Sequence, residues 1–216
     1  MSAPQRDDLS VDQQLAMTTA ATRLATRFGG VFSVETIDRF LVSSYDEFAG
    51  RATIPNFLPL LAERFARQRL EALAKVEGKT HDGRPVVLFL CVHNTGRSQM
   101  ALGFLQHHAG ESVVGWSGGS RPGEAIEAGA VAVMAERGID IAQEYPKPWT
   151  DEIVRAADVV ITMGCGDACP IFPGKRYEEW ELADPADLEL DGVRAVRDDI
   201  ERRVRRLLDS LGVAAA

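Results

Sequence analysis

The fold is decided by residues 86–98, VVLFLCVHNTGRS, where an apolar run leads into a short polar loop. The run Val86–Leu90 is apolar throughout and begins with two β-branched valines, which is typical of a strand buried on both faces. A helix is expected to begin at Ser98 and to reach about His107. A buried strand that passes through a tight loop into a helix indicates a parallel α/β sheet.

The chain downstream of this unit continues the alternation of strands and helices. The further predicted elements are strands near 113–116, at 158–163 and near 176–180, and helices at 124–136, 151–157 and 192–211. Alternating strands and helices form parallel sheets that are covered on both sides. We therefore expect an α/β fold with a four-stranded parallel sheet and helices on both faces.

The chain upstream of this unit has the apolar period of helices and no strand pattern. Three helices are predicted, over 10–28, over 34–48 and from Asn56, a candidate N-cap, to about residue 73. The first is expected to bury a stripe through Leu15, Ala21, Leu24 and Phe28. The following polar stretch 77–85 contains two glycines and a proline, which indicates a linker. We expect a small all-α three-helix domain at 1–80 and the α/β domain at 81–216.

Composition excludes several classes of protein. The 216 residues are 45% hydrophobic and 26% charged, which are ordinary globular values and exclude wholesale disorder and a collagen-like repeat. No apolar run approaches the ~20 residues of a membrane-spanning helix, and residues 1–20 lack the pattern of a signal peptide. We therefore expect a cytoplasmic protein that does not bind membranes.

The net charge of −8 is unevenly distributed, because basic and acidic residues balance over 1–85 and the excess of acid lies in 86–216. A helical part without an excess of Lys and Arg argues against nucleic-acid binding, although Arg64, Arg67 and Arg69 cluster in its third helix. A homodimer interface, or docking against the α/β domain, is the simpler expectation for so small a helical unit.

The loop between the predicted strand and helix, Cys91–Ser98, carries the residues of an oxyanion site. Its position directs backbone N–H groups and the positive end of the helix dipole toward one point, which suits phosphate or arsenate. Arg97 can clamp two oxyanion oxygens, and the same positive field favours the nucleophilic thiolate of Cys91. A buried structural cysteine is typical of an isolated Cys-x5-Arg, but the order of strand, loop, Arg97, Ser98 and helix favours the anion site.

Two more cysteines, Cys165 and Cys169, follow the strand predicted at 158–163. Because ligands collect at the carboxyl ends of parallel strands, we expect this pair to lie near Cys91. A zinc site is disfavoured, since Cys-x3-Cys lacks a second pair of ligands. Two inert core thiols and a redox relay among three cysteines both stay open, and the neighbouring Gly, Asp and Pro residues favour an exposed loop and hence the relay.

Residues 89–101, FLCVHNTGRSQMA, resemble the active-site loop of arsenate reductases built on the low-molecular-weight protein tyrosine phosphatase fold. The continuation 97–101 is similar to the reductase branch, and 117–119 stands where the family has a Ser-Ala-Gly turn. The resemblance covers residues 86–211 and implies that Cys91 is the nucleophile and that Asn94 and Ser98 support the loop. It also implies that the oxyanion is bound by Val92, His93, Asn94, Thr95, Gly96, Arg97 and Ser98.

The resemblance to thioredoxin-coupled arsenate reductases implies a three-step relay. Cys91 attacks arsenate and forms a thiol-arseno adduct, and Cys165 then attacks Cys91, which releases arsenite and leaves a Cys91–Cys165 disulfide. Cys169 attacks Cys165, and an external reductant reopens the resulting disulfide. Thioredoxin is the expected reductant. A mycothiol/mycoredoxin or glutathione pathway, which needs only Cys91, is the alternative.

Asp184, in an Asp-Pro pair after the strand that contains Trp180, is the general acid that the resemblance implies. By itself an Asp-Pro pair indicates only a turn. The same Cys91, Arg97 and Asp184 would also serve a low-molecular-weight protein tyrosine phosphatase with a cysteinyl-phosphate intermediate, which is the alternative function. Ala186 and Asp187 lack the aromatic rings with which phosphatases hold an aryl phosphate, and this weakens that alternative.

The resemblance has two departures that bear on the site. Gly96 replaces a second loop cysteine that is common in the family, and Leu102 stands where some members place a glutamate of a potassium site. We therefore expect no metal and no cofactor. Arsenate is the expected substrate, with phosphate or sulfate as competing anions.

Overall fold

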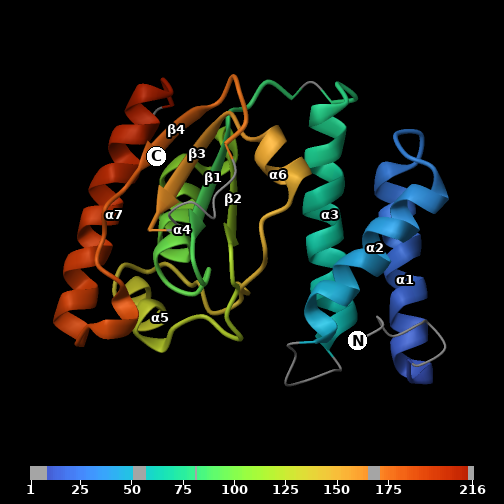
Figure 1. The fold of residues 1–216 in the computed structure, drawn as a ribbon, viewed down its shortest axis with the longest axis horizontal. Coiled ribbons are helices and arrows are strands. Elements are labelled where there is room, and N and C mark those ends of the chain that lie inside the picture. The colour runs from blue at the N-terminus through green and yellow to red at the C-terminus, as the bar shows by residue number, and fades with distance from the viewer. Residues whose placement is uncertain (1–8, 51–56, 81, 165–170, 214–216) are drawn as a thin grey trace. The chain divides into compact units, whose positions relative to one another are not determined.

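The computed structural model describes residues 9–50, 57–80, 82–164 and 171–213, and the chain divides into two units, Met1–His81 and Asp82–Ala216. The first unit is helical, and the second contains the sheet (Figure 1). None of the helices within the described residues is long and apolar enough to cross a membrane.

The helical unit consists of α1 (Val11–Phe28), α2 (Val34–Ala49) and α3 (Leu58–Val76). Ser10 caps α1 in a capping box with Gln13, and the Ser33 side chain accepts a hydrogen bond from the backbone of α2. Apolar side chains of all three helices form the core of the unit. Its most buried large members include Leu24, Ile37, Leu41, Phe65 and Leu70. The predicted cap Asn56 lies outside the described residues, and Phe57 occupies the N-cap position of α3.

The apolar stripe of α1 differs from the expectation. Leu15 is 66% exposed, and the buried residues of α1 are Met17, Ala20, Leu24 and Phe28. Leu15 is two positions from Met17, which is about 200° around a helix of 3.6 residues per turn. It therefore lies on the opposite face, and the prediction for Leu15 was wrong.

The second unit is built on a four-stranded parallel sheet with the strand order β2-β1-β3-β4. Its strands are β1 (Val86–Cys91), β2 (Val114–Gly119), β3 (Val159–Met163) and β4 (Arg176–Glu179). All six residues of β1 are buried, as expected for a central strand with covered faces. The fold class predicted from the sequence is confirmed.

Helices cover both faces of this sheet (Figure 1). The helices are α4 (Arg97–Ala109), α5 (Ala128–Ala135), α6 (Asp151–Ala156) and α7 (Leu190–Ser210). Val87, Phe89 and Cys91 of β1 share one apolar core with side chains of α4, α5 and α7. In Figure 1, α6 lies on the side of the sheet away from α4 and α7. The central strand β1 thus ends between two covered faces, where its last residue is shielded from bulk water.

One helix begins later than expected. The predicted helix at 124–136 is α5, which begins only at Ala128, so residues 120–127 form a connection after β2. This segment is not helical, and three of its backbone N–H groups bond to the loop that follows β1. The sequence pattern could not reveal these bonds, because their acceptors lie about 30 residues earlier in the chain.

Candidate active site

Cys91 is the last residue of β1, and the loop that follows it leads directly into α4. Its side chain is buried, with Sγ 3.0 Å from Ser98 Oγ. The backbone N–H of Asn94 donates a hydrogen bond to the same sulfur at 3.2 Å. The Ser98 hydroxyl can donate or accept in its contact with the sulfur, whereas the Asn94 N–H donates to it. These contacts fix the position of the sulfur at the end of β1.

Asn94 holds the loop in shape. It is the single described non-glycine residue with a positive φ, 53°. Its Nδ2 donates to Ser98 Oγ at 2.8 Å, and its Oδ1 accepts from the Lys147 backbone N–H at 3.0 Å and from Gln99 Nε2 at 3.1 Å. These bonds compensate the unfavourable backbone conformation and orient the hydroxyl that contacts Cys91.

The connection after β2 forms the outer wall of the loop. Backbone N–H groups within 121–127 donate to the carbonyl oxygens of Val92, His93 and Thr95 at 2.9, 2.9 and 3.0 Å. A trans peptide points its N–H away from its C=O, so carbonyls bonded outward turn the following N–H groups toward the inside of the loop. The Asn94 N–H, which follows the His93 carbonyl, indeed points at Cys91. Several N–H groups that face one point form an anion-binding loop.

Two glycines allow backbones to approach closely here. A Cβ on Gly119, at the end of β2, would lie 2.7 Å from the Val92 carbonyl oxygen. A Cβ on Gly123 would lie 2.6 Å from Thr95 Cγ2. Both contacts are too short for a side chain, so the wall packs against the loop only because these positions are glycine.

Arg97 and Asp184 are distant in the chain and are in contact in the structure. Arg97 begins α4, and its buried guanidinium forms an ion pair with Asp184 and donates from Nη1 to the Leu182 carbonyl oxygen at 3.3 Å. Asp184 caps a short 3-10 helix, Pro185–Asp187, and its side chain is 31% exposed. A guanidinium has five N–H donors, so these two bonds leave others for the oxygens of an anion.

Gly164, which immediately precedes Cys165, lies against Arg97. Its φ is +76°, and a Cβ built on it would lie 3.1 Å from Arg97 Nη1. The candidate residues Cys165 and Cys169 themselves lie outside the described residues. Gly164 is the last described residue before them, and it lies beside the Arg97 guanidinium.

The structure thus brings together most of the residues predicted from the sequence. Cys91, Asn94 and Ser98 are in mutual contact, and Arg97 pairs with Asp184. Val92 and His93 contribute bonded carbonyls to the outer wall, while the backbone conformation of Gly96 begins α4. These placements are consistent with an anion site.

Sequence reasoning missed the residues that hold the loop from elsewhere in the fold. Gln99 Nε2 donates to both oxygens of Asn94 and to the Tyr145 carbonyl oxygen, and the Thr95 hydroxyl donates to Glu127 Oε1 at 2.6 Å. Gln99 lies in the quoted loop motif, two positions after the start of α4, so an amide side chain within that motif was a usable indication. Nothing in the sequence indicates that Glu127 contacts the loop, because it falls within the helix predicted at 124–136.

No group of three or more His, Cys, Asp or Glu side chains suitable for a metal ion exists among the described residues. Leu102 of α4 is buried in the apolar core, and its side chain has no oxygen that could bind a metal ion.

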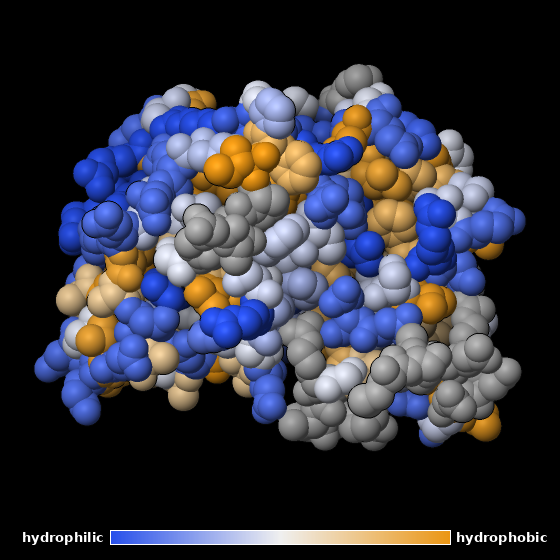
Figure 2. Space-filling model, viewed as in Figure 1, coloured by the Kyte–Doolittle hydropathy of each residue, from blue (hydrophilic) through white to orange (hydrophobic). Residues whose placement is uncertain are grey.

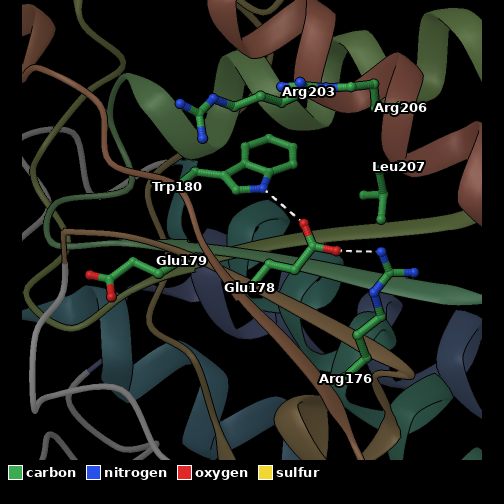
Figure 3. A pocket seen from close by; sticks show the side chains of 7 residues that line it. All are labelled: Arg176, Glu178, Glu179, Trp180, Arg203, Arg206 and Leu207. Carbon is green, nitrogen blue, oxygen red and sulfur yellow. Dashed lines mark hydrogen bonds and ion pairs between the residues drawn. The ribbon is translucent and has the colours of Figure 1, made fainter.

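A pocket of about 410 Å³ lies elsewhere, between β4 and α7 (Figure 3). Two of its charged side chains pair with each other, Glu178 and Arg176, and Glu178 also accepts a hydrogen bond from Trp180 Nε1 at 3.1 Å. None of its lining residues belongs to the loop 91–98 or to the segment 182–187. It is separate from the candidate active site.

Two family models match the chain. Residues 86–215 match the model described as low molecular weight phosphotyrosine protein phosphatase. Residues 17–74 match the model described as the N-terminal domain of protein-tyrosine-phosphatase-like proteins. The two matches correspond to the α/β unit and to the helices that precede it.

Relatives with assigned activities match the chain as well. The thioredoxin-dependent arsenate reductase of Corynebacterium glutamicum has a solved structure that is 46% identical, with a TM-score of 0.84, and the match covers 93% of this chain and 98% of that one. The arsenate reductases of Bacillus licheniformis and Halalkalibacterium halodurans are 34% and 33% identical, and each match covers 59% of this chain and 97% of the relative. The match to the Corynebacterium protein covers 93% of the chain and so includes most of the helical unit. The other two matches are shorter, and each has about the length of the α/β unit.

Proposed function

The chain belongs to the low molecular weight phosphotyrosine protein phosphatase family and reduces arsenate, and we propose that it does so with Cys91 as nucleophile and a relay through Cys165 and Cys169. The observation that carries this proposal is the hydrogen-bonded group of Cys91, Asn94 and Ser98 at the end of β1, together with the Arg97–Asp184 pair at the start of α4. In this proposal Cys91 is the nucleophile, Arg97 binds the anion and Asp184 is the proton donor.

The first step is the attack of the Cys91 thiolate on arsenic. Arg97 and the N–H groups of residues 92–98 hold the oxyanion, and the positive charge of Arg97 balances the negative charge of the bound anion. The oxyanion replaces Asp184 as the partner of Arg97, and the Asp184 carboxyl, once protonated, gives its proton to the departing oxygen, which leaves as water. The product is an adduct of Cys91 sulfur with arsenic(V). The Arg97–Asp184 ion pair places the two side chains next to each other before the anion binds.

The second step transfers two electrons to arsenic. The Cys165 thiolate attacks Cys91 sulfur, the sulfur–arsenic bond breaks, and arsenic leaves with the bonding electrons as arsenite. Each of the two cysteines loses one electron as the Cys91–Cys165 disulfide forms. The position of Gly164 beside Arg97 supports this step, because Gly164 is the residue that precedes Cys165 in the sequence.

The third step frees the nucleophile. Cys169 attacks Cys165 sulfur, Cys91 leaves as a thiolate, and the Cys165–Cys169 disulfide is reduced by an external dithiol. Thioredoxin is the proposed dithiol, since a relative that matches nearly the full chain is thioredoxin-dependent. A mycothiol/mycoredoxin system would instead act directly on Cys91.

The relay is tested by arsenate reduction with the full chain, thioredoxin, thioredoxin reductase and NADPH. The Cys165→Ser variant should lose turnover while keeping one round of adduct formation at Cys91, and Cys169→Ser should accumulate the Cys91–Cys165 disulfide. Turnover that persists in a variant lacking both cysteines, with mycothiol and mycoredoxin as reductants, would replace the relay by the one-cysteine pathway.

Phosphate-ester hydrolysis is the second candidate activity, because the same nucleophile, clamp and acid suffice for it. The Cys165→Ser variant separates the two reactions. Hydrolysis of p-nitrophenyl phosphate needs no relay and should be unaffected, whereas arsenate turnover should be lost. A chain that hydrolyses phosphotyrosine peptides efficiently and does not reduce arsenate would reverse the order of the two candidates.

For the helical unit we propose a role in homodimer formation. It exposes several large apolar side chains: Val11, Leu15, Val34, Phe57 and Leu60. The space-filling view shows hydrophobic residues on the surface between hydrophilic ones (Figure 2). Light scattering after gel filtration should give a dimer mass for the full chain, and Leu60→Glu should lower that mass. A monomer at micromolar concentration contradicts the proposal.

A further inference from the structure

Asp184, the proposed acid, lies in the segment that follows β4. Both ends of this segment are anchored in the fold. At one end Trp180 is buried, and its backbone N–H donates to the Thr162 carbonyl oxygen at 2.8 Å. At the other end Pro185 is buried. The stretch between these anchors, residues 181–184, therefore decides where the acid stands.

Few contacts with the rest of the protein hold this stretch. Among the described residues, the backbone of 181–183 takes part in two hydrogen bonds, and both donors are arginines. Arg97 Nη1 donates to the Leu182 carbonyl oxygen at 3.3 Å, and Arg203 Nη2 donates to the Glu181 carbonyl oxygen at 3.4 Å. Two of these three residues are exposed. A segment with so few bonds and so little burial depends on each contact for its position.

Arg203, in α7, is itself fixed by its neighbours. Its Nε donates to Asp199 Oδ2 at 3.1 Å, one helical turn earlier. Its guanidinium lies over the Trp180 ring, 5.9 Å from the ring centroid (Figure 3). The side chain is 25% exposed. The guanidinium thus reaches the Glu181 carbonyl oxygen from a defined position.

The two arginines have different relations to the substrate. Arg97 is the anion clamp of the proposed function, and a bound oxyanion replaces Asp184 as its partner. Within the described chain, the bonds and the ring contact of Arg203 are with Asp199, Trp180 and Glu181, and none of these belongs to the anion-binding loop. The bond from Arg203 to the acid segment is therefore independent of whether an anion is bound.

We propose that Arg203 is a positioning residue, which holds residues 181–184 so that the Asp184 carboxyl stays beside the anion once the oxyanion has become the partner of Arg97. This inference rests on the proposed function, in which Asp184 protonates the departing oxygen. Arg203 bonds the carbonyl of Glu181, three positions before the acid, so it works through the segment and not on the substrate. An acid displaced from its place transfers its proton more slowly.

Arsenate reduction by the full chain with thioredoxin, thioredoxin reductase and NADPH tests this role. Arg203→Met removes the guanidinium and keeps an apolar side chain over Trp180. It should lower kcat/KM for arsenate by about three- to tenfold, the value of one hydrogen bond of ordinary strength. Arg202→Met is the matched control, because Arg202 is exposed and pairs with the same Asp199 at 2.9 Å. It removes the same charge from the same helix and should leave kcat/KM unchanged.

A double-mutant cycle separates positioning from a structural role. Because Arg203 acts through Asp184, Arg203→Met should have no further effect in the Asp184→Asn background, where there is no acid to position. A merely structural role would lower kcat/KM by the same factor in both backgrounds, and that result would overturn the proposal. An unchanged kcat/KM in Arg203→Met alone would also overturn it and leave the proposed function intact. A normal kcat/KM in Asp184→Asn would instead refute the acid itself, and this inference with it.

The dependence on the leaving group gives a second readout. A p-nitrophenolate leaves readily without a proton, whereas the departure of phenolate needs the acid. Arg203→Met should therefore lower kcat/KM for phenyl phosphate by about three- to tenfold relative to that for p-nitrophenyl phosphate, and Arg202→Met should leave this ratio unchanged. An equal loss for both esters would contradict the positioning role. If the parent hydrolyses neither ester, the arsenate cycle alone decides.

Discussion

Arg97, at the start of α4, and Arg197, in the middle of α7, are both buried, with exposed fractions of 7% and 5%. All three nitrogens of the Arg197 guanidinium are engaged, with Asp198, with the Glu136 carboxylate at 2.7 Å and with the Val133 carbonyl oxygen at 3.0 Å. Among the described residues, Arg97 bonds Asp184 and the Leu182 carbonyl oxygen. The described part of the protein therefore uses more of the donors of Arg197 than of Arg97.

The surroundings of the two arginines differ in the same way. Near Arg197, the Glu136 carboxylate is shared with Arg194, and Arg137 pairs with Asp198, so positive and negative groups neutralise one another. Around Arg97 the loop supplies backbone N–H groups, and a bound anion would complete the charge balance. Burial alone therefore does not identify a functional arginine, and guanidinium N–H groups that no protein acceptor uses are the better indication.

The largest expected effect comes from shortening the clamp in Arg97→Lys. The ammonium keeps the charge but loses the planar pair of donors, so kcat/KM for arsenate should fall by about 100- to 1000-fold. Steady-state kinetics with thioredoxin measure it. Arg197→Lys is the matched control and should leave kcat/KM within about twofold, so equal losses in both variants would remove the distinction between the two arginines.

Asp184→Asn removes both the proposed acid and the ion-pair partner of Arg97. We expect kcat to fall by about 100-fold, because the departing oxygen loses its proton donor. Single-turnover measurement of adduct formation at Cys91 localises the defect to the first step. A normal rate of adduct formation would mean that another group, or water, supplies the proton.

Arg197→Met should act on stability instead of activity. It leaves the Val133 carbonyl without this donor and removes one partner each from Glu136 and Asp198, which retain Arg194 and Arg137. The free energy of unfolding should fall by about 1–3 kcal/mol, as measured by urea denaturation. The folded variant should have an unchanged KM, and a large rise in KM would link this cluster to the active site.

The smallest expected effect concerns acid stability. Hydrogen bonds from Arg194 and Arg197 lower the pKa of Glu136 to about 2 from its ordinary value of 4.5. A carboxylate whose pKa is lower in the folded than in the unfolded chain stabilises the fold at pH values above the pKa of the unfolded chain. That contribution is lost as the pH falls from about 4.5 to about 2. Thermal unfolding of Glu136→Gln should therefore approach that of the parent as the pH falls through this range. A difference that stays constant with pH would exclude this origin.

The sequence allowed the core of this site to be predicted because its parts are neighbours in the chain. Cys91, Asn94, Arg97 and Ser98 lie within one turn between a strand and a helix, and the apolar run before them identifies the strand. The boundaries of α4 and α7 differ from the expected ones by at most two residues. The late start of α5 was missed, since apolar periodicity carries no record of bonds to a distant loop.

Asp184 was found only through the resemblance, since an Asp-Pro pair indicates no more than a turn. Its contact with Arg97 spans 87 positions in the chain, and no local pattern predicts such a contact. The same is true of Glu127 and Thr95, which are 32 positions apart. Long-range contacts of this kind become visible only when the fold is known.

By itself, the sequence determined the α/β class, the helical unit before it, and a loop with a cysteine and an arginine at the end of the central strand. These follow from hydrophobic period and local backbone chemistry, which act over a few neighbouring residues. Only the tertiary structure decided which carboxylates stand at that loop and how Asn94 is held by Gln99 and the Lys147 backbone. Packing joins segments distant in the chain, and the chemical character of the site depends on that packing.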